Sequence, residues 1–460
     1  MSPKTLRVIL VLSCLLFCPG FGVLAKSQDK ELAQKTEHLF GPRSGKIVYL
    51  TLKECLAQAL AHYGELRVAD DDLELAKEKE VEASHIGTPI LEYEYDLGPA
   101  PKNINEAVDS FFSGDLTVFN KWKVGVGVPL TTFGKVKTGR ALARVGIEAE
   151  KEKKVKKKAE VILKIKQLYN GILLAREVNR LLSSAHDGVY DQIKEREAKG
   201  GTDPTQLLKL KLFRAELEKR IQEGETREIL AKEALGVQVG MDPKVHFEIE
   251  SGKLRPVDQR MKGFEEYRQE ASQWRSDLKL LELGTLAKET QLTLEKRLMT
   301  PNLAAGAFFE MGYTPNITNA AQTDDFTDPF NFTRAGIGLQ LKGQFDFHSS
   351  FSKVRQVKRE IHKLEIQKEL AAEGVELEVK EAFLEVQSTH QDVERAEEAG
   401  KLSRQLLFLT QSNYDIGLAD PEDFIDALKS FLETRGQYFE AVFHYNVAVA
   451  QLDQKVGRVP

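Results

Sequence analysis

Residues 413–428 of the chain read Asn413-Tyr414-Asp415-Ile416-Gly417-Leu418-Ala419-Asp420-Pro421-Glu422-Asp423-Phe424-Ile425-Asp426-Ala427-Leu428. The stretch carries the signals of a helix end, a tight turn and a new helix. Gly417 suits the left-handed position just past a helix C-terminus. Asp420 can cap the next helix, and Pro421 then stands at its first position, where a missing N–H costs nothing. The stretch therefore predicts a hairpin of two helices.

A second turn of the same kind stands earlier in the chain, at Lys199-Gly200-Gly201-Thr202-Asp203-Pro204. Its last two residues, Asp203 and Pro204, take the capping positions. The residues that follow each turn keep one register, so that Leu235 falls on Leu452 and Gly240 on Gly457. The chain is therefore predicted to be a duplicated hairpin rather than a series of unrelated domains.

The N-terminus has the pattern of a secretory signal peptide over residues 1–25. Lys4 and Arg7 precede an apolar run, and small residues follow near position 25. Lipidation at Cys18 is the alternative, which the bulky Phe17 disfavours because lipoprotein signals have a small residue there. Cleavage removes two of the three cysteines, so that Cys55 remains and no intrachain disulfide is expected. No later segment is apolar over the roughly 20 residues that a membrane helix needs.

Four segments alternate apolar residues with polar or small ones, two in each half of the chain. They are expected as strands over about residues 89–97, 122–131, 302–313 and 333–342. Each is long enough to cross a bilayer when tilted, although a half-buried sheet of a soluble domain gives the same alternation. Four strands cannot close a barrel, and lipid does not tolerate open sheet edges. If the strands span a membrane, several copies of the chain must share one barrel.

The remaining segments have helical periodicity. Long helices are expected over about residues 135–197 and 352–414, each roughly 95 Å by the rise per residue. Shorter helices are expected over about 51–84, 204–238, 263–299 and 421–456, the last with a coiled-coil seam that runs from Phe424 to Val456. The lysine run 151–158 surrounds its helix and is expected to be a solvated surface; a contact with anionic lipid or a partner is the alternative. The domain organisation is then a leader at 26–47, repeats at 48–240 and 263–457, and a linker at 241–262.

This ordered set resembles the TolC-like outer membrane efflux protein family over about residues 48–457. The resemblance rests on the opening segment 50–60, on the strand-to-helix passages 128–135 and 344–347, and above all on residues 414–428 with the Tyr- and Ala-rich helix that follows them. It implies a mostly α fold with a membrane β part, in which three chains form one twelve-stranded β-barrel and one α-helical tunnel. Members are passive exit ducts in the Gram-negative outer membrane, recruited by a periplasmic adaptor and an inner-membrane pump that holds most of the selectivity for cargo.

The resemblance also implies roles for residues of the turns. Asp423 and Asp426 match the aspartate rings that narrow the tunnel entrance, where carboxylates attract cations and repel anions. Asp423 also lies in the first turn of a helix, where an acid is favoured as a cap. Ala419 replaces a basic residue that latches the closed entrance in the family. The residues that match the adaptor-docking tips are Ile416, Gly417, Leu418, Gly200, Gly201 and Thr202.

Other classes of protein fit less well. The net charge is −5 with acids and bases interleaved, which gives no electrostatic basis for nucleic-acid binding. No P-loop, Gly-x-Ser-x-Gly elbow or metal-ligand spacing of histidines occurs, so we expect neither an enzyme nor a cofactor or metal site. The alternative is a periplasmic coiled-coil adaptor or structural protein without a membrane barrel. Adaptors usually place one hairpin within β-rich flanks, whereas this chain has two hairpins and paired strands.

Overall fold

The structure is a computed structural model that describes residues 47–85, 87–103, 106–199, 204–242, 245–250, 252–317, 330–343, 345–416 and 418–458. Two compact units divide the chain. The first comprises Met1–Asp70, Glu152–Lys279 and Leu370–Pro460, and the second comprises Asp71–Lys151 and Leu280–Glu369. The long helices α6 (Lys135–Lys199) and α10 (Phe347–Asp415) contribute residues to both units.

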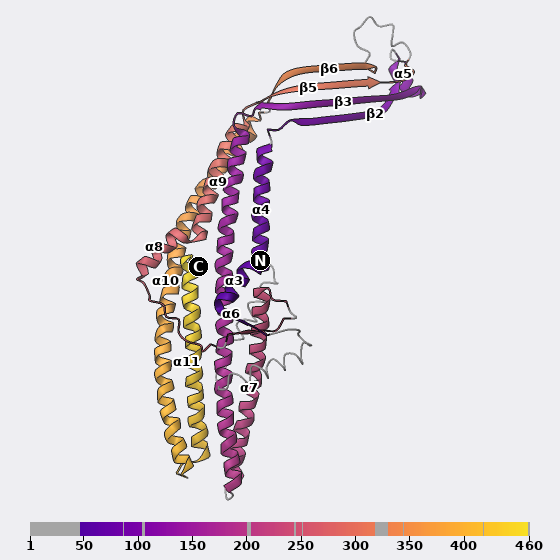
Figure 1. Cartoon of the computed structure of the whole chain (residues 1–460). Helices are drawn as coiled ribbons and strands as arrows, with labels where there is room; N and C mark the ends of the chain where they lie inside the picture. The colour runs from indigo at the N-terminus through magenta and orange to yellow at the C-terminus, as the bar shows by residue number, and fades with distance from the viewer. Residues whose placement is uncertain are drawn as a thin grey trace. The chain divides into compact units, whose positions relative to one another are not determined.

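The first unit contains two helical hairpins, which appear in Figure 1 as the magenta pair and the yellow-orange pair of helices. The lower part of α6 pairs with α7 (Pro204–Val239), and the lower part of α10 pairs with α11 (Pro421–Val456). Two short helices per repeat complete the pattern, namely α3 (Leu52–His62) before α4 (Gly64–His85), and α8 (Phe264–Trp274) before α9 (Ser276–Leu298). The predicted mostly α fold with duplicated long hairpins is confirmed.

Helix α11 shows how the predicted seam differs from the buried face. Both ends of the seam are buried, but in the middle Phe431, Arg435 and Tyr438 are only partly buried. The buried positions there lie one residue later, at Leu432, Gly436 and Phe439. The buried stripe therefore departs from the strict seven-residue repeat in the middle of α11 and returns to it toward the C-terminus.

A short parallel pair of strands joins the beginning of the first repeat to the linker. Strand β1 (Val48–Leu50) pairs with β4 (Phe247–Ile249), and β4 is buried throughout. Beneath it, Arg176 of α6 pairs with Glu248 and, at 2.8 Å, with Glu228 of α7. Lys232 completes the cluster at 2.7 Å from Glu248 and 3.1 Å from Glu228. Two cations therefore balance two carboxylates in a buried site that fixes the linker to the first hairpin.

The lysine run of α6 is more than a solvated surface. Lys154 pairs with Asp70, Lys156 with Asp277 and Lys157 with Glu65. Each of these acids belongs to a different turn of α4 or α9, so the run connects α6 to both short helices. The partners lie more than 80 residues away in sequence, which is why the charge run by itself predicted only solvation.

The second unit contains one antiparallel sheet with the order β2-β3-β5-β6, seen edge to edge in Figure 1. The strands are β2 (Ile90–Pro101), β3 (Leu116–Thr131), β5 (Asn302–Tyr313) and β6 (Phe332–Lys342). The first two extend beyond the expected ranges, and a short helix, α5 (Ala107–Ser113), lies between them. The sheet register places strands of both repeats side by side, since β3 pairs with β5.

Candidate functional site at the hairpin ends and the sheet

The turn between α10 and α11 is built by the residues that the sequence singled out. The N–H of Leu418 donates to the carbonyl oxygen of Asn413 at 2.8 Å and closes the end of α10. Asp420 is the N-cap of α11 with extended backbone angles, and Pro421 follows at the first position. The turn is therefore stabilised from both helices. Gly417, and in the first hairpin Gly200, Gly201, Thr202 and Asp203, lie outside the described residues.

The two candidate constriction residues differ in their surroundings. Both Asp423 and Asp426 are exposed on α11. The carboxylate of Asp423 accepts a hydrogen bond from the N–H of Asp420 at 3.2 Å, which makes it a capping residue as well. Within the described part of the chain no basic side chain pairs with the carboxylate of Asp426. Asp423 thus helps to cap α11, whereas the carboxylate of Asp426 makes no such capping contact.

Two apolar side chains of the same turn point away from the core. Ile416 is 70% exposed and Leu418 is 77% exposed. Large apolar side chains on a tight turn between charged residues form a surface that a partner can cover. Pro204, at the start of α7 in the first hairpin, is also exposed.

Just behind the turns, an apolar cluster connects the two hairpins. Tyr414 is its central side chain, with 1% exposure, and its ring stacks on Phe424 at a centroid distance of 5.2 Å. The Arg196 guanidinium of α6 also lies over the Tyr414 ring, 3.8 Å from its centroid. Burial raises the pKa of the Tyr414 phenol, and Arg196 opposes that rise. Buried members from both hairpins are Leu182, Ala185, Val189, Ile193, Leu210, Phe213, Leu217, Ile425, Leu428 and Leu432.

Polar contacts at the rim of this cluster also join the hairpins. Lys209 of α7 pairs with Glu422 of α11, and the amide of Gln192 donates to Asp415 at 3.3 Å. Ala419 packs against the cluster as a partly buried residue. Sequence reasoning missed Arg196 and Lys209, because only the fold brings α6 and α7 against the second turn.

The sheet forms the second candidate surface. Its register aligns the apolar residues on one face, where Tyr95 lies opposite Trp122 with ring centroids 4.6 Å apart. Apolar side chains of this face are strongly exposed, up to 84% for Tyr93 and 91% for Ile337. In the described residues β2 pairs only with β3, and β6 only with β5, so both edges carry unpaired backbone groups.

The opposite face of the sheet is polar. One row of directly opposed residues crosses all four strands as Glu94, Lys123, Glu310 and Arg334, with alternating charge. Lys123 lies 3.4 Å from Glu94, and the neighbouring Lys121 lies 2.9 Å from Asp96 and 3.7 Å from Glu310. Glycines occupy much of the rest of this face. The sheet therefore has an apolar face and a mainly polar one, as the alternation predicted, although Ile90 and Phe308 are exposed on the polar face.

No group of three or more His, Cys, Asp or Glu side chains in the described ranges is arranged to hold a metal ion. No described helix combines the length and apolar character needed to cross a membrane.

Comparisons with known proteins show which fold this is. No protein-family model and no curated protein sequence matches the chain. Among solved structures, the chain is similar to the channel-forming protein CusC with a TM-score of 0.70 and 14% identity, over 89% of this chain and 93% of CusC. It is similar to the Campylobacter jejuni CmeC outer membrane channel with a TM-score of 0.70 and 14% identity, over 88% and 85% of the two chains. It is also similar to the outer membrane protein VceC of Vibrio cholerae with a TM-score of 0.67 and 16% identity, over 88% of this chain and 96% of VceC.

The chain therefore has the fold of TolC-like outer membrane channels. The sequence resemblance to this family is therefore confirmed for the fold.

Proposed function

We propose that the chain is one protomer of a homotrimeric exit duct in the Gram-negative outer membrane. The observation that carries the proposal is the four-stranded sheet, whose exposed face is apolar and whose two edges are unpaired, in a chain with the fold of outer membrane channels. Lipid covers an exposed apolar face favourably, and pairing with other copies removes the edges. Three copies of the sheet supply the twelve strands of one barrel, with the charged face toward water.

The helical hairpins supply the periplasmic part of the duct in this proposal. Ile416 and Leu418 are the apolar contacts at which a periplasmic adaptor docks, because both are exposed at the end of the second hairpin. Substrates delivered by the adaptor and its inner-membrane pump then pass through passively. The duct performs no chemistry, and its own selectivity comes from charges along the passage.

The entrance constriction is assigned to Asp426, with Asp423 in a double role. Three copies of each aspartate around an axis would concentrate cations and repel anions. Asp426 is the stronger candidate because its exposed carboxylate has no capping contact, whereas that of Asp423 accepts the Asp420 N–H. Asp423 would serve the turn and the constriction together.

Cell fractionation tests the location and assembly of the protein. The full-length chain, expressed in a Gram-negative host, is expected in the outer membrane fraction, soluble only with detergent, and as an oligomer that separates into monomers on heating in SDS. Recovery as a detergent-independent soluble monomer from the periplasm would support the coiled-coil adaptor instead.

A further inference from the structure

Each repeat contains a break between its two short helices, and the two breaks are built alike. Tyr63 separates α3 from α4 with extended angles of φ −61° and ψ 124°, and Arg275 separates α8 from α9 with φ −67° and ψ 116°. A glycine with positive φ ends the neighbouring hairpin helix at each break. A Cβ at Gly240 would lie 2.8 Å from the Cβ of His62, and one at Gly457 would lie 2.8 Å from the carbonyl oxygen of Trp274. We call these sites the first and second joints.

Two adjacent lysines of α6 each form an ion pair with the helix that follows one of the joints. Lys157 lies 2.5 Å from Glu65, the second residue of α4, and Lys156 lies 2.5 Å from Asp277, the second residue of α9. An acid in the first turn of a helix is favoured by the helix dipole, so both carboxylates are well placed to keep their charge. To this extent the two joints are equivalent.

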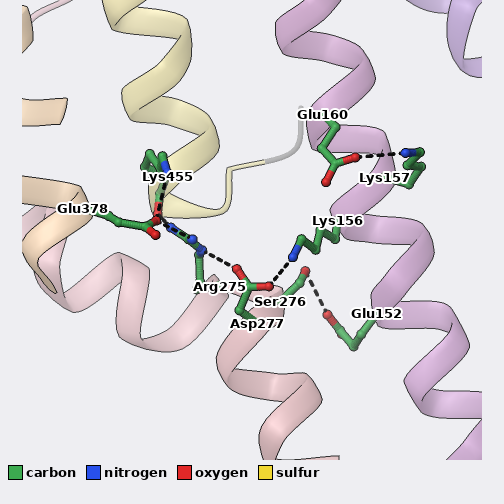
Figure 2. A network of polar contacts seen from close by, with 9 residues as sticks. All are labelled: Glu152, Lys156, Lys157, Glu160, Arg275, Ser276, Asp277, Glu378 and Lys455. Carbon is green, nitrogen blue, oxygen red and sulfur yellow. Dashed lines mark hydrogen bonds and ion pairs between the residues drawn. The ribbon is translucent and has the colours of Figure 1, made fainter. Parts of the chain in front are cut away.

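The second joint differs because its break residue is an arginine. Figure 2 shows Arg275 between the second hairpin and α6. Its guanidinium donates to Glu378 of α10 at 2.6 Å, to the carbonyl oxygen of Lys455 of α11 at 2.9 Å, and to Asp277 at 3.0 Å. Lys455 also donates to Glu378 at 2.9 Å. A continuous chain of charges thus joins α11, α10, α9 and α6.

The first joint has no equivalent of this arginine. Tyr63 is uncharged, and its ring faces Lys164 of α6 with the ammonium nitrogen 5.9 Å from the ring centroid. The Arg275 side chain is only 13% exposed, whereas that of its partner Glu378 is 41% exposed. Burial alone would raise the pKa values of Asp277 and Glu378, but their hydrogen bonds with Lys156, Lys455 and Arg275 outweigh it and hold both carboxyls below their usual range. Both carboxylates therefore stay ionised near neutral pH.

This network lies far from the turn of the second hairpin, so a small rotation at the second joint would move the turn by a large distance. From Glu378 to the end of α10 at Asp415, the helix rise corresponds to about 55 Å. A rotation of about 10° at the joint would displace the turn by about 10 Å over that length. The turn carries the exposed Ile416, Leu418 and Asp426. Near the turn the two hairpins also meet, through the buried cluster around Tyr414 and the exposed Lys209–Glu422 pair.

We infer that the Arg275 network is the pivot that sets the angle of the second hairpin (α10–α11) against the first, and so the width of the entrance. The inference rests on the proposed duct. Arg275 acts as a positioning residue for Asp423 and Asp426 through the helices rather than by touching what passes. Loss of its charge releases α10 and α11 together, because the same guanidinium binds both.

Distances between spin labels test the pivot directly. One label is placed at Lys194→Cys on α6 and one at Ser412→Cys on α10, with labelled chains diluted about tenfold into unlabelled ones so that only intrachain pairs are seen. Cys55 is buried and its pKa is raised to about 11, so it stays unlabelled. Arg275→Gln and Asp277→Asn are expected to shift or broaden the distance distribution by about 5 Å or more, and to raise bilayer conductance at least about twofold.

The first joint supplies the matched control. Glu65→Gln removes the equivalent bond to α6 but leaves the Arg275 network intact, so distance and conductance should stay at wild-type values. Unchanged distances in both second-joint variants, or equal shifts in Glu65→Gln, would overturn the pivot. Asp277→Asn is the milder variant if Arg275→Gln does not fold. The label distance is measured whether or not the protein conducts, so a failed pivot is distinguishable from a failed duct.

Discussion

At the scale of single residues, the two aspartates of the second turn differ in their contacts. They lie three residues apart on one exposed face, yet only Asp423 accepts a backbone hydrogen bond. One substitution at each position should therefore give different results, although the charge removed is the same.

Asp426→Asn is expected to lower the cation-to-anion permeability ratio of the reconstituted protein at least about twofold, with little change in stability. Asp423→Asn is expected to lower selectivity and also to destabilise the turn by about 1 kcal/mol, because the cap is weakened. Reversal potentials in planar bilayers and thermal unfolding measure the two effects. Glu422→Gln is the control, since Glu422 pairs with Lys209; equal loss of selectivity in this variant would contradict the assignment.

The buried charge cluster at the linker should control stability. Glu248→Gln leaves Arg176 and Lys232 with one carboxylate, Glu228, and is expected to cost about 3–5 kcal/mol of unfolding free energy. Glu250→Gln, at an exposed site two residues later, is expected to cost almost nothing. Chemical denaturation in detergent, followed by circular dichroism, measures both. Equal stability of the two variants would show that the cluster does not hold the linker.

The same cluster predicts a pH dependence. Burial alone would raise the pKa of Glu228, but Lys232 and Arg176 outweigh it, so its pKa lies below the ordinary 4.5. A carboxyl with a depressed pKa in the folded state contributes stability above its unfolded pKa and loses it as the pH falls through the folded value. The denaturant concentration at the unfolding midpoint should therefore decrease as the pH is lowered below about 4.5. The decrease should be less steep in Glu228→Gln. Parallel pH profiles for wild type and variant would contradict this.

At the scale of helices and strands, sequence pattern and structure agree where periodicity carries the signal. The alternation of Tyr93, Tyr95 and their neighbours predicted the two faces of the sheet, because side chains of a strand alternate whatever the strand pairs with. The strand order, the pairing of β3 with β5 and the short β1–β4 pair were beyond reach, since they depend on contacts between distant segments. The same holds for the contacts of Arg196 with Tyr414 and of Arg275 with Glu378 and Lys455, because only the fold brings these residues near.

The contact between the hairpins near the turn can be tested at this scale. Tyr414→Ala removes the ring that contacts both Phe424 and Arg196 and is expected to cost about 3 kcal/mol of unfolding free energy. Tyr414→Phe keeps the ring and should stay within about 1 kcal/mol of wild type. Thermal unfolding in detergent compares them. A loss in Tyr414→Phe as large as in Tyr414→Ala would assign the effect to the hydroxyl rather than to the stacked ring.

At the scale of the whole molecule, the central claim is that several copies of this chain form a conducting duct. The exposed apolar face and the unpaired edges of the sheet give a single copy a surface that water does not favour. The conductance of the purified protein in planar lipid bilayers tests the claim most directly. We predict discrete, cation-selective conductance steps from the SDS-resistant oligomer. A protein that inserts no channels under any condition, and remains a monomer without detergent, would contradict the account.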